Sequence, residues 1–223
     1  MNRVALAVSG VSVQASSLSD WSTYSPWRPS LVVDARHCID LISRDVPLTP
    51  DTSVLEIGCG YGIFTCQLAG DCRVHGIDVS IDDLRLNPVP AVSQMDGARL
   101  AFADASFDVV LAHHSLHHIA GRRRALAEMA RVTRRYVVVA DLNRWNPVNR
   151  FFLAVGAEDT PDPYFTCSWL TGAFERVGLC VVRHRTWGMM SPFLTPHLLM
   201  PLQRLTWFEQ PLGLEHLVIG EKR

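Results

Sequence analysis

A short acidic, glycine-rich segment carries the residue types best suited to hold a small ligand. Glu56 stands two positions before three glycines that alternate with other residues. The segment comprises Glu56, Ile57, Gly58, Cys59, Gly60, Tyr61 and Gly62. Glycine lets a ligand approach the main chain closely, and the backbone N–H groups of such a turn point at that ligand. Dinucleotide sites use G-x-G-x-x-G, and a carboxylate here would repel a pyrophosphate, so the segment favours a cationic ligand.

Strands and helices that alternate along the chain must position this segment. The apolar run at 53–57 predicts a buried strand before the glycines, and 63–69 predicts a helix after them. Further strands are expected at 73–78, 91–95, 107–112, 136–140, 179–185 and 216–221, and further helices at 30–43, 81–86, 122–132 and 169–177. This alternation predicts a Rossmann-like, doubly wound α/β sheet of seven strands, mostly parallel, with helices on both faces.

A second carboxylate lies at the end of the second expected strand. Asp78 would lie beside the glycine turn and could accept hydrogen bonds from both hydroxyls of a ribose. The alternative role is the N-cap of the helix expected at 81–86, which Ser80 or Asp82 could also fill. We therefore favour ribose binding for Asp78.

These segments resemble the cofactor motifs of the class I S-adenosylmethionine-dependent methyltransferases, in the order in which that family has them. E-x-G-x-G-x-G is similar to motif I, Gly76-Ile77-Asp78 to the ribose-binding segment, and residues 94–110 to the approach to the fourth strand. The resemblance covers about residues 30–185. It implies an antiparallel last strand, S-adenosylmethionine as cofactor, S-adenosylhomocysteine as product, and an adenine amine bound by Asp96. The cofactor-binding residues that it implies are Glu56, Gly58, Cys59, Gly60, Gly62, Asp78, Val79, Met95, Asp96, Gly97 and His113.

Four histidines follow the fourth expected strand and are the candidates for acid–base chemistry. They are His113, His114, His117 and His118. No carboxylate or cysteine is interleaved with them at a metal-ligand spacing, so no metal site is predicted. An imidazole can accept the proton of a hydroxyl or an activated carbon as the methyl group arrives. His114 and His117 are three residues apart, could share a helical face, and are the predicted catalytic bases; packing or a place around the cofactor is the alternative.

Composition and charge exclude several classes of function. The 223 residues are 48% hydrophobic, which is enough for one α/β core. The net charge of −1 does not indicate a nucleic-acid-binding protein, which would carry an excess of basic residues. The basic run at 122–124 is typical of a solvent-exposed helix face. No apolar run reaches the ~20 residues of a membrane span, so stable membrane insertion is not expected. Six cysteines without metal-ligand spacing, and an N-terminal apolar run too interrupted for a signal peptide, predict a cytoplasmic protein.

One domain with two accessory segments is the expected organisation. Residues 1–29 are expected to form a leader or lid, and residues 30–223 the methyltransferase domain. Residues 186–215 are rich in aromatic residues, methionine and leucine, and predict a cap over an apolar acceptor. Core packing together with a dimer contact is the alternative for this segment, so a homodimer is a further expectation.

The resemblance implies a methyltransferase, and the apolar segment at 186–215 favours a small, apolar or aromatic acceptor. Methylation at oxygen is favoured, and methylation at carbon is the second option. The segment after the fourth strand lacks the N/D-P-P-Y/F element of enzymes that methylate amino groups of nucleobases and glutamine, which disfavours those substrates. The alternative function is a cofactor-binding member of the same fold that does not methylate, such as a cyclase-like or binding protein. The glycine spacing disfavours a nicotinamide-dependent oxidoreductase.

Overall fold

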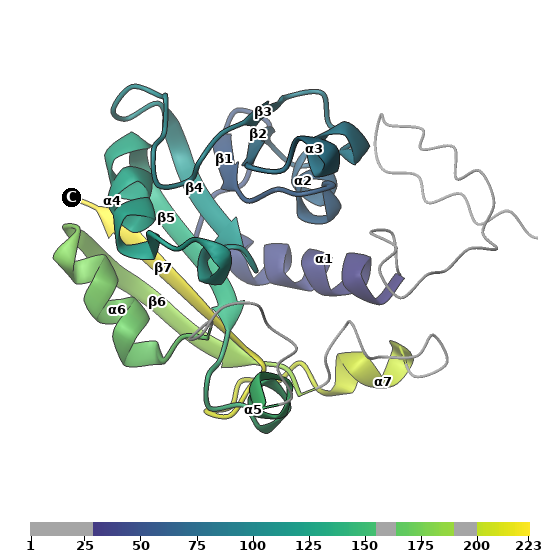
Figure 1. Cartoon of the computed structure of the whole chain (residues 1–223). Helices are drawn as coiled ribbons and strands as arrows, with labels where there is room; N and C mark the ends of the chain where they lie inside the picture. The colour runs from purple at the N-terminus through teal and green to yellow at the C-terminus, as the bar shows by residue number, and fades with distance from the viewer. Residues whose placement is uncertain (1–28, 155–163, 190–199) are drawn as a thin grey trace, which may run out of the picture.

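Seven strands form one mixed sheet, and helices cover both of its faces (Figure 1). The computed structural model describes residues 29–154, 164–189 and 200–223. The strands lie in the order β3-β2-β1-β4-β5-β7-β6. Their bounds are β1 Ser53–Ile57, β2 Arg73–Asp78, β3 Val92–Gln94, β4 Phe107–His113, β5 Thr133–Leu142, β6 Leu179–Trp187 and β7 Glu215–Lys222. The predicted doubly wound α/β sheet is confirmed.

Strands β1 to β5 run parallel to one another, and the last strand reverses direction. β1 pairs in parallel with β2 and with β4, and β3 and β5 continue the parallel set on either side. β7 lies between β5 and β6 and is antiparallel to both, as the resemblance implied. The chain order reverses between β1 and β4, and such a switch point leaves a crevice at the carboxyl ends of the strands.

The helices bury their apolar faces against the two sides of the sheet. Their bounds are α1 Pro29–Ser43, α2 Ile63–Leu68, α3 Ile81–Leu86, α4 Arg122–Val132, α5 Pro147–Ala154, α6 Cys167–Arg176 and α7 Met200–Leu205, with a 3-10 turn, η1, at Leu116–His118. Alternate residues of a strand point to opposite faces. Val54 therefore packs in one apolar cluster with Phe64 of α2, and Leu55 in the other with Leu126 of α4. Among the described residues, no helix has both the length and the apolarity to cross a bilayer.

Element boundaries differ from the sequence-based expectations by a few residues. β5, expected at 136–140, extends over Thr133–Leu142, because it is a central strand paired with β4 along one edge and β7 along the other. The short helix α5 was not expected, and α7 lies where leucines recur at helical spacing. The leader, apart from Pro29, and residues 190–199 of the expected cap lie outside the described residues.

The described part of the expected cap packs against the body of the domain. Trp187 is 2% exposed and belongs to the core between α1 and the sheet. Trp207 stacks on His37 of α1 with the ring centroids 3.9 Å apart. In the described residues, these two tryptophans therefore contribute to packing, which was the alternative role for the segment.

Candidate functional site

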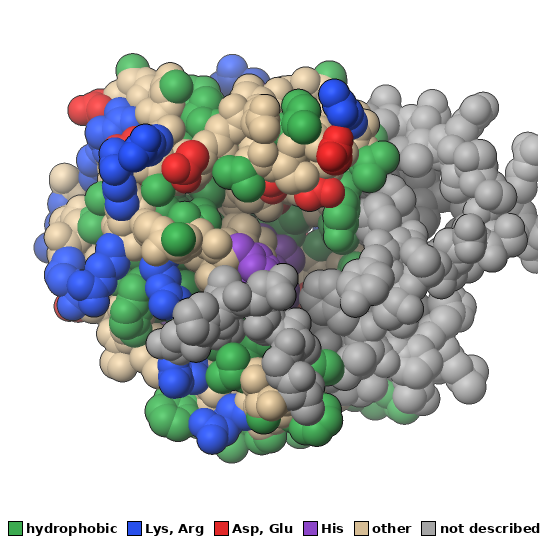
Figure 2. Space-filling view, viewed as in Figure 1, with side chains coloured by type: hydrophobic (Ala, Val, Ile, Leu, Met, Phe, Trp, Pro, Cys, Tyr) green, Lys and Arg blue, Asp and Glu red, His purple; other side chains and the backbone are tan. Residues whose placement is uncertain are grey.

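A cavity of about 800 Å³ opens at the switch point, where β1, β2 and β4 end. Its wall consists of the glycine turn, the segments that follow β2, β3 and β4, and the inner face of α1. Figure 2 shows histidine side chains in a hollow of this face, below a group of acidic side chains. Every predicted cofactor-binding residue lines the cavity except Gly62. Motif residues that are up to 57 positions apart in the sequence, from Glu56 to His113, thus meet at one place.

Positive φ angles at the glycines make the turn possible. Gly58, Gly60 and Gly62 have φ values of +71°, +47° and +89°. A Cβ on Gly62 would collide with the Asn87 side chain, so this glycine is required by the turn itself and not by the cavity. A Cβ on Gly60 would meet no atom within 4 Å, which leaves the main chain there open to a ligand.

Asp78 is held in place by the glycine turn and by the start of α3. Its Oδ2 accepts from the Gly60 N–H at 2.8 Å, and its Oδ1 accepts from the Ser80 N–H at 2.9 Å. A carboxylate oxygen has two lone pairs, so each oxygen retains one for a ligand. The N-cap of α3 is Ser80, whose Oγ accepts from the Asp83 N–H at 3.2 Å. The capping role is therefore filled by Ser80, and Asp78 lines the cavity.

The segment after β3 supplies a second carboxylate beside apolar atoms. Asp96 accepts from the Ala98 N–H at 2.8 Å through Oδ1. Gly97 lies so close to Ile57 and Ile119 that a Cβ there would approach their side chains to 2.7 and 3.0 Å. Glycine is therefore required here by close packing, and the Asp96 carboxylate lines the cavity beside these apolar side chains, where it could receive the amino group of an adenine.

Glu56 is a buried carboxylate that lacks a partner on one oxygen. The residue is 2% exposed, and its Oε2 accepts no hydrogen bond from the described residues. Burial raises the pKa of Glu56 to about 7, with a smaller contribution in the same direction from Asp78. A buried carboxylate without a counter-charge is costly, so a cation that reaches this end of the cavity is stabilised. The S-adenosylmethionine amino group fits that requirement.

We expect the affinity for S-adenosylmethionine to fall below pH 7 as Glu56 takes up a proton. The carboxyl is ionised above its pKa of about 7 and neutral below it, and only the ionised form attracts the cationic ligand. Titration calorimetry should give about tenfold weaker binding at pH 5.5 than at pH 7. The Glu56→Gln variant should bind weakly at both values. A flat profile for the wild-type chain, with circular dichroism showing it folded throughout, would contradict this role.

The two histidines at the end of β4 form a stack that reaches the cavity. The His113 ring lies 4.2 Å from the Phe64 ring and 4.3 Å from the His114 ring, measured between centroids. Burial, together with the neighbouring His114, lowers the pKa of His113 well below its usual value, which keeps it neutral. His113 thus serves as a flat, uncharged wall of the cavity.

His114 is paired with an acid from the opposite end of the chain. Its Nε2 lies 3.1 Å from Oε2 of Glu215, the first residue of β7. Burial by itself lowers the pKa of His114, but the carboxylates of Glu215, Asp141 and Asp34 outweigh burial and raise it to about 9. The backbone of His114 has a φ of +48°, an uncommon value for a residue other than glycine. A strained, charge-paired imidazole on the cavity wall is a candidate for proton transfer.

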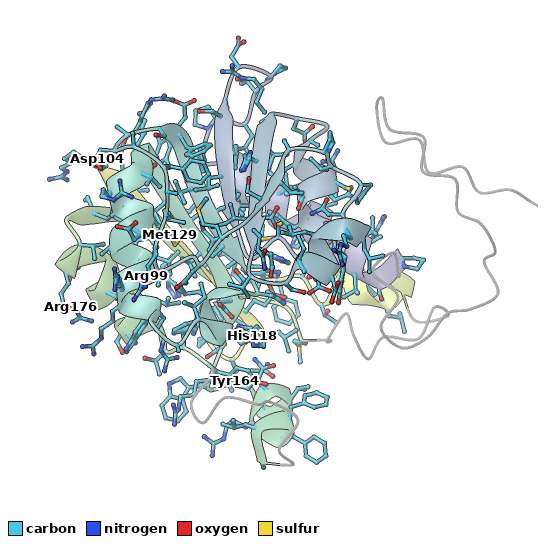
Figure 3. The ribbon with its side chains drawn as sticks, turned by 45° about the horizontal axis from the view of Figure 1, so that its top comes forward. Arg99, Asp104, His118, Met129, Tyr164 and Arg176 are labelled. Carbon is cyan, nitrogen blue, oxygen red and sulfur yellow. The ribbon has the colours of Figure 1, made fainter. Side chains whose placement is uncertain are left out.

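The expectation that His114 and His117 share a helical face is wrong. His114 has a positive φ and precedes the 3-10 turn, so the two residues do not lie on one helix. His117 is 5% exposed, and its Nδ1 forms a hydrogen bond of 2.5 Å with Oδ1 of Asp141. It does not line the cavity, whereas the neighbouring His118 does (Figure 3). We therefore keep His114 and drop His117 as the candidate base.

Two carboxylates of the site were missed by sequence reasoning. Asp34 is 5% exposed on α1 and lines the cavity, and burial, reinforced by Glu215, raises its pKa well above its usual value. A signal for Asp34 was present, because it interrupts the apolar stripe of its helix between Leu31 and Cys38. Glu215 had no such signal, because only the pairing of β7 with β5 in the sheet brings it close to His114, which follows β4.

Three side chains of this cluster could hold a divalent cation. His113, His114 and Glu215 each place one possible ligand atom within 4.8 Å of the others. The prediction of no metal site rested on carboxylates and cysteines close to the histidines in sequence. The fold brings a further carboxylate, that of Glu215 in β7, beside His113 and His114. A protonated His114 balances Glu215 without a metal.

Comparisons with known proteins bear directly on this cavity. A family model described as a methyltransferase domain matches residues 55–139, which run from within β1 into β5. Residues 55–139 therefore form a methyltransferase domain, as the resemblance to the class I S-adenosylmethionine-dependent methyltransferases implied. The family and the cofactor that the sequence motifs implied are thereby confirmed. The roles of the individual cavity residues in this methyltransferase remain predictions.

Relatives of this methyltransferase differ in what they act on. An O-methyltransferase of Penicillium expansum is 34% identical over 144 residues, which are 58% of this chain and 52% of that protein. A phosphatidylethanolamine N-methyltransferase of Cereibacter sphaeroides is 32% identical over 102 residues, 41% of this chain and 50% of that protein. The chain thus spans about half the length of the curated relatives it matches.

A solved structure shares the fold over most of its length. It is an S-adenosylmethionine-dependent methyltransferase of Thermotoga maritima, described as a possible histamine N-methyltransferase. It superposes with a TM-score of 0.67 at 17% identity and covers 88% of this chain and 93% of that chain. At this identity the likeness concerns the fold alone.

Proposed function

We propose that this methyltransferase transfers a methyl group to an oxygen atom of a small, apolar or aromatic acceptor. The observation that carries the proposal is the His114–Glu215 pair on the wall of the cofactor cavity. A hydroxyl is a poor nucleophile until it loses its proton, so a positioned base beside the cofactor suits O-methylation. The similarity to an O-methyltransferase over 58% of the chain is in keeping with this choice.

The reaction needs an orienting site, a base and a dry space. S-adenosylmethionine supplies an electrophilic methyl group on a positively charged sulfur. Glu56, Asp78 and Asp96 would orient the cofactor, and the acceptor hydroxyl would give its proton to the ring nitrogen of His114 that does not face Glu215, as its oxygen bonds to the methyl carbon. The bound cofactor would give up its methyl group with the electron pair of the C–S bond left on sulfur, and S-adenosylhomocysteine would be the product. Glu215 stabilises the imidazolium that forms.

An apolar acceptor is proposed from the side chains on the α1 and α2 side of the cavity. Leu31, Ile63 and Phe64 lie on this wall, next to the stacked ring of His113. Apolar surface of this kind attracts an aromatic or aliphatic acceptor and excludes water from the transfer. Asp34 and His114 line the same cavity, and the reacting hydroxyl is proposed to lie beside them.

The test is formation of S-adenosylhomocysteine with a panel of acceptors that differ only in the reacting group. We expect turnover with a phenol and none with its methyl ether, and slower turnover with the matching aniline. A parallel series with EDTA should leave the rate unchanged if His114 acts as a base and is not a metal ligand. Tight calorimetric binding of S-adenosylmethionine without S-adenosylhomocysteine from any acceptor would instead identify a binding protein.

A further inference from the structure

Helix α5 exposes the side chains that a helix normally buries. The helix, Pro147–Ala154, has the sequence PVNRFFLA, and its one buried residue is Asn149. Phe151 is 62% exposed, and Trp145, just before the helix, is 54% exposed. A helix of a globular domain usually turns its apolar side inward, so this orientation is inverted. Exposed clusters of large apolar side chains commonly mark a contact surface.

Three asparagines hold α5 in this inverted orientation. The side-chain amides of Asn143, Asn146 and Asn149 donate hydrogen bonds of 2.8 Å to the carbonyl oxygens of residues 213, 212 and 214, respectively. Oδ1 of Asn146 also accepts from the N–H groups of residues 148 and 149 at the start of the helix. Buried amides with satisfied partners fix a unique geometry. These hydrogen bonds therefore hold the helix in the orientation that exposes Phe151.

Positive charge accompanies the exposed aromatic side chains. The Arg150 guanidinium lies 5.9 Å from the centroid of the Trp145 ring, a cation–π distance. Arg144 precedes Trp145, and residues 142–154 contain no aspartate or glutamate. Leu212, on the loop that Asn146 anchors, is 52% exposed beside this helix. In Figure 2 the lower end of the described molecule, where α5 lies, shows hydrophobic and basic side chains.

This surface lies at the same edge of the sheet as the cofactor cavity. α5 follows the carboxyl end of β5, and the cavity opens where the parallel strands β1, β2 and β4 end. Asp141, near the end of β5, forms a hydrogen bond with the histidine next to the cavity residue His118. Figures 1 and 3 both show α5 projecting from the body of the molecule at this edge.

We propose that Trp145, Phe151 and Arg150 dock the chain on a lipid surface that carries anionic headgroups. Aromatic rings insert at the headgroup level of a bilayer, and arginine pairs with lipid phosphates. A two-fold contact between two copies of this chain would place the same positive charge on both sides of the interface, whereas a phosphate surface offers the opposite charge. Docking would turn the cavity edge toward the bilayer, where an apolar acceptor dissolves.

The test is sedimentation of the full chain with vesicles of phosphatidylcholine alone or mixed equally with phosphatidylglycerol. We expect binding to the mixed vesicles that weakens with added salt. The double variant Trp145→Ser/Phe151→Ser should bind at least about tenfold more weakly, and Arg150→Gln about fivefold. Leu86→Ser on α3, where the leucine is 65% exposed, is the matched apolar control and should bind like wild type.

Three results would overturn the proposal. They are absence of binding to mixed vesicles, equal binding by the double variant and by Leu86→Ser, and a wild-type dimer that the double variant converts to a monomer. The last result would assign the surface to a second copy of the chain. Calorimetric binding of S-adenosylmethionine, which none of these variants should alter, separates a failure here from a failure of the proposed function.

Discussion

Replacing Asp78 by alanine is expected to weaken S-adenosylmethionine binding by about 100-fold while the chain remains folded. The substitution removes the carboxylate that would receive both ribose hydroxyls, and hydrogen bonds to a charged group contribute about 1.5–3 kcal/mol each. It also deprives the Gly60 and Ser80 N–H groups of their acceptor, which loosens the glycine turn. Titration calorimetry with S-adenosylmethionine and S-adenosylhomocysteine should show the same loss, because both ligands carry the ribose.

Two further variants separate the ribose role from an effect on the fold. Asp78→Asn retains one acceptor for the turn and loses the charge, so its affinity should fall between those of the wild type and the alanine variant. Asp82→Ala removes a carboxylate that is 84% exposed on α3 and should bind like wild type. Unchanged affinity in Asp78→Ala, with an unchanged thermal midpoint, would refute the ribose role.

The cofactor side of the cavity was predictable because its signals are local. A strand, a turn with three glycines and a helix follow one another within residues 53–68, and Asp78 closes the next strand. Parallel strands bring their carboxyl ends to one edge, so the predicted order of strands already implied that these groups meet. The positive φ angles of the three glycines explain why glycine is needed at these positions, which the spacing alone did not show.

The acceptor side was less predictable because its decisive contacts are not local. His114 and Glu215 are far apart in sequence, and only the insertion of β7 beside β5 brings them together. The helical spacing of His114 and His117 misled, because the positive φ of His114 ends the regular backbone before the turn begins. α5 escaped notice for a related reason: its buried residue is the polar Asn149, and its aromatic Phe151 is exposed, the reverse of the expected pattern.

Replacing His114 by alanine is expected to lower kcat by about 100- to 1,000-fold with little change in cofactor affinity. General-base catalysis contributes about 10²- to 10⁴-fold, and His114 is the base in the proposed reaction. His75→Ala is a suitable control, because His75 lies on β2, forms a hydrogen bond with Ser93 and does not line the cavity. Loss of cofactor binding in His114→Ala, or turnover equal to that of the control, would contradict the assignment.

The pH dependence of kcat gives a sharper test, because its sign depends on Glu215. His114 can accept a proton only when neutral, so kcat of the wild type should rise with pH, with its midpoint near pH 9, and level off above that value. Glu215→Gln removes the main carboxylate that raises the pKa of His114, so its rising limb should move to lower pH. The same pairing stabilises the fold fully below pH 6.5 and loses that effect as pH rises through 9, so circular dichroism must show folded protein at each pH. If Glu215 has only a structural role, the Glu215→Gln variant will have a lower thermal midpoint, and kcat will rise over the same pH range as in the wild type.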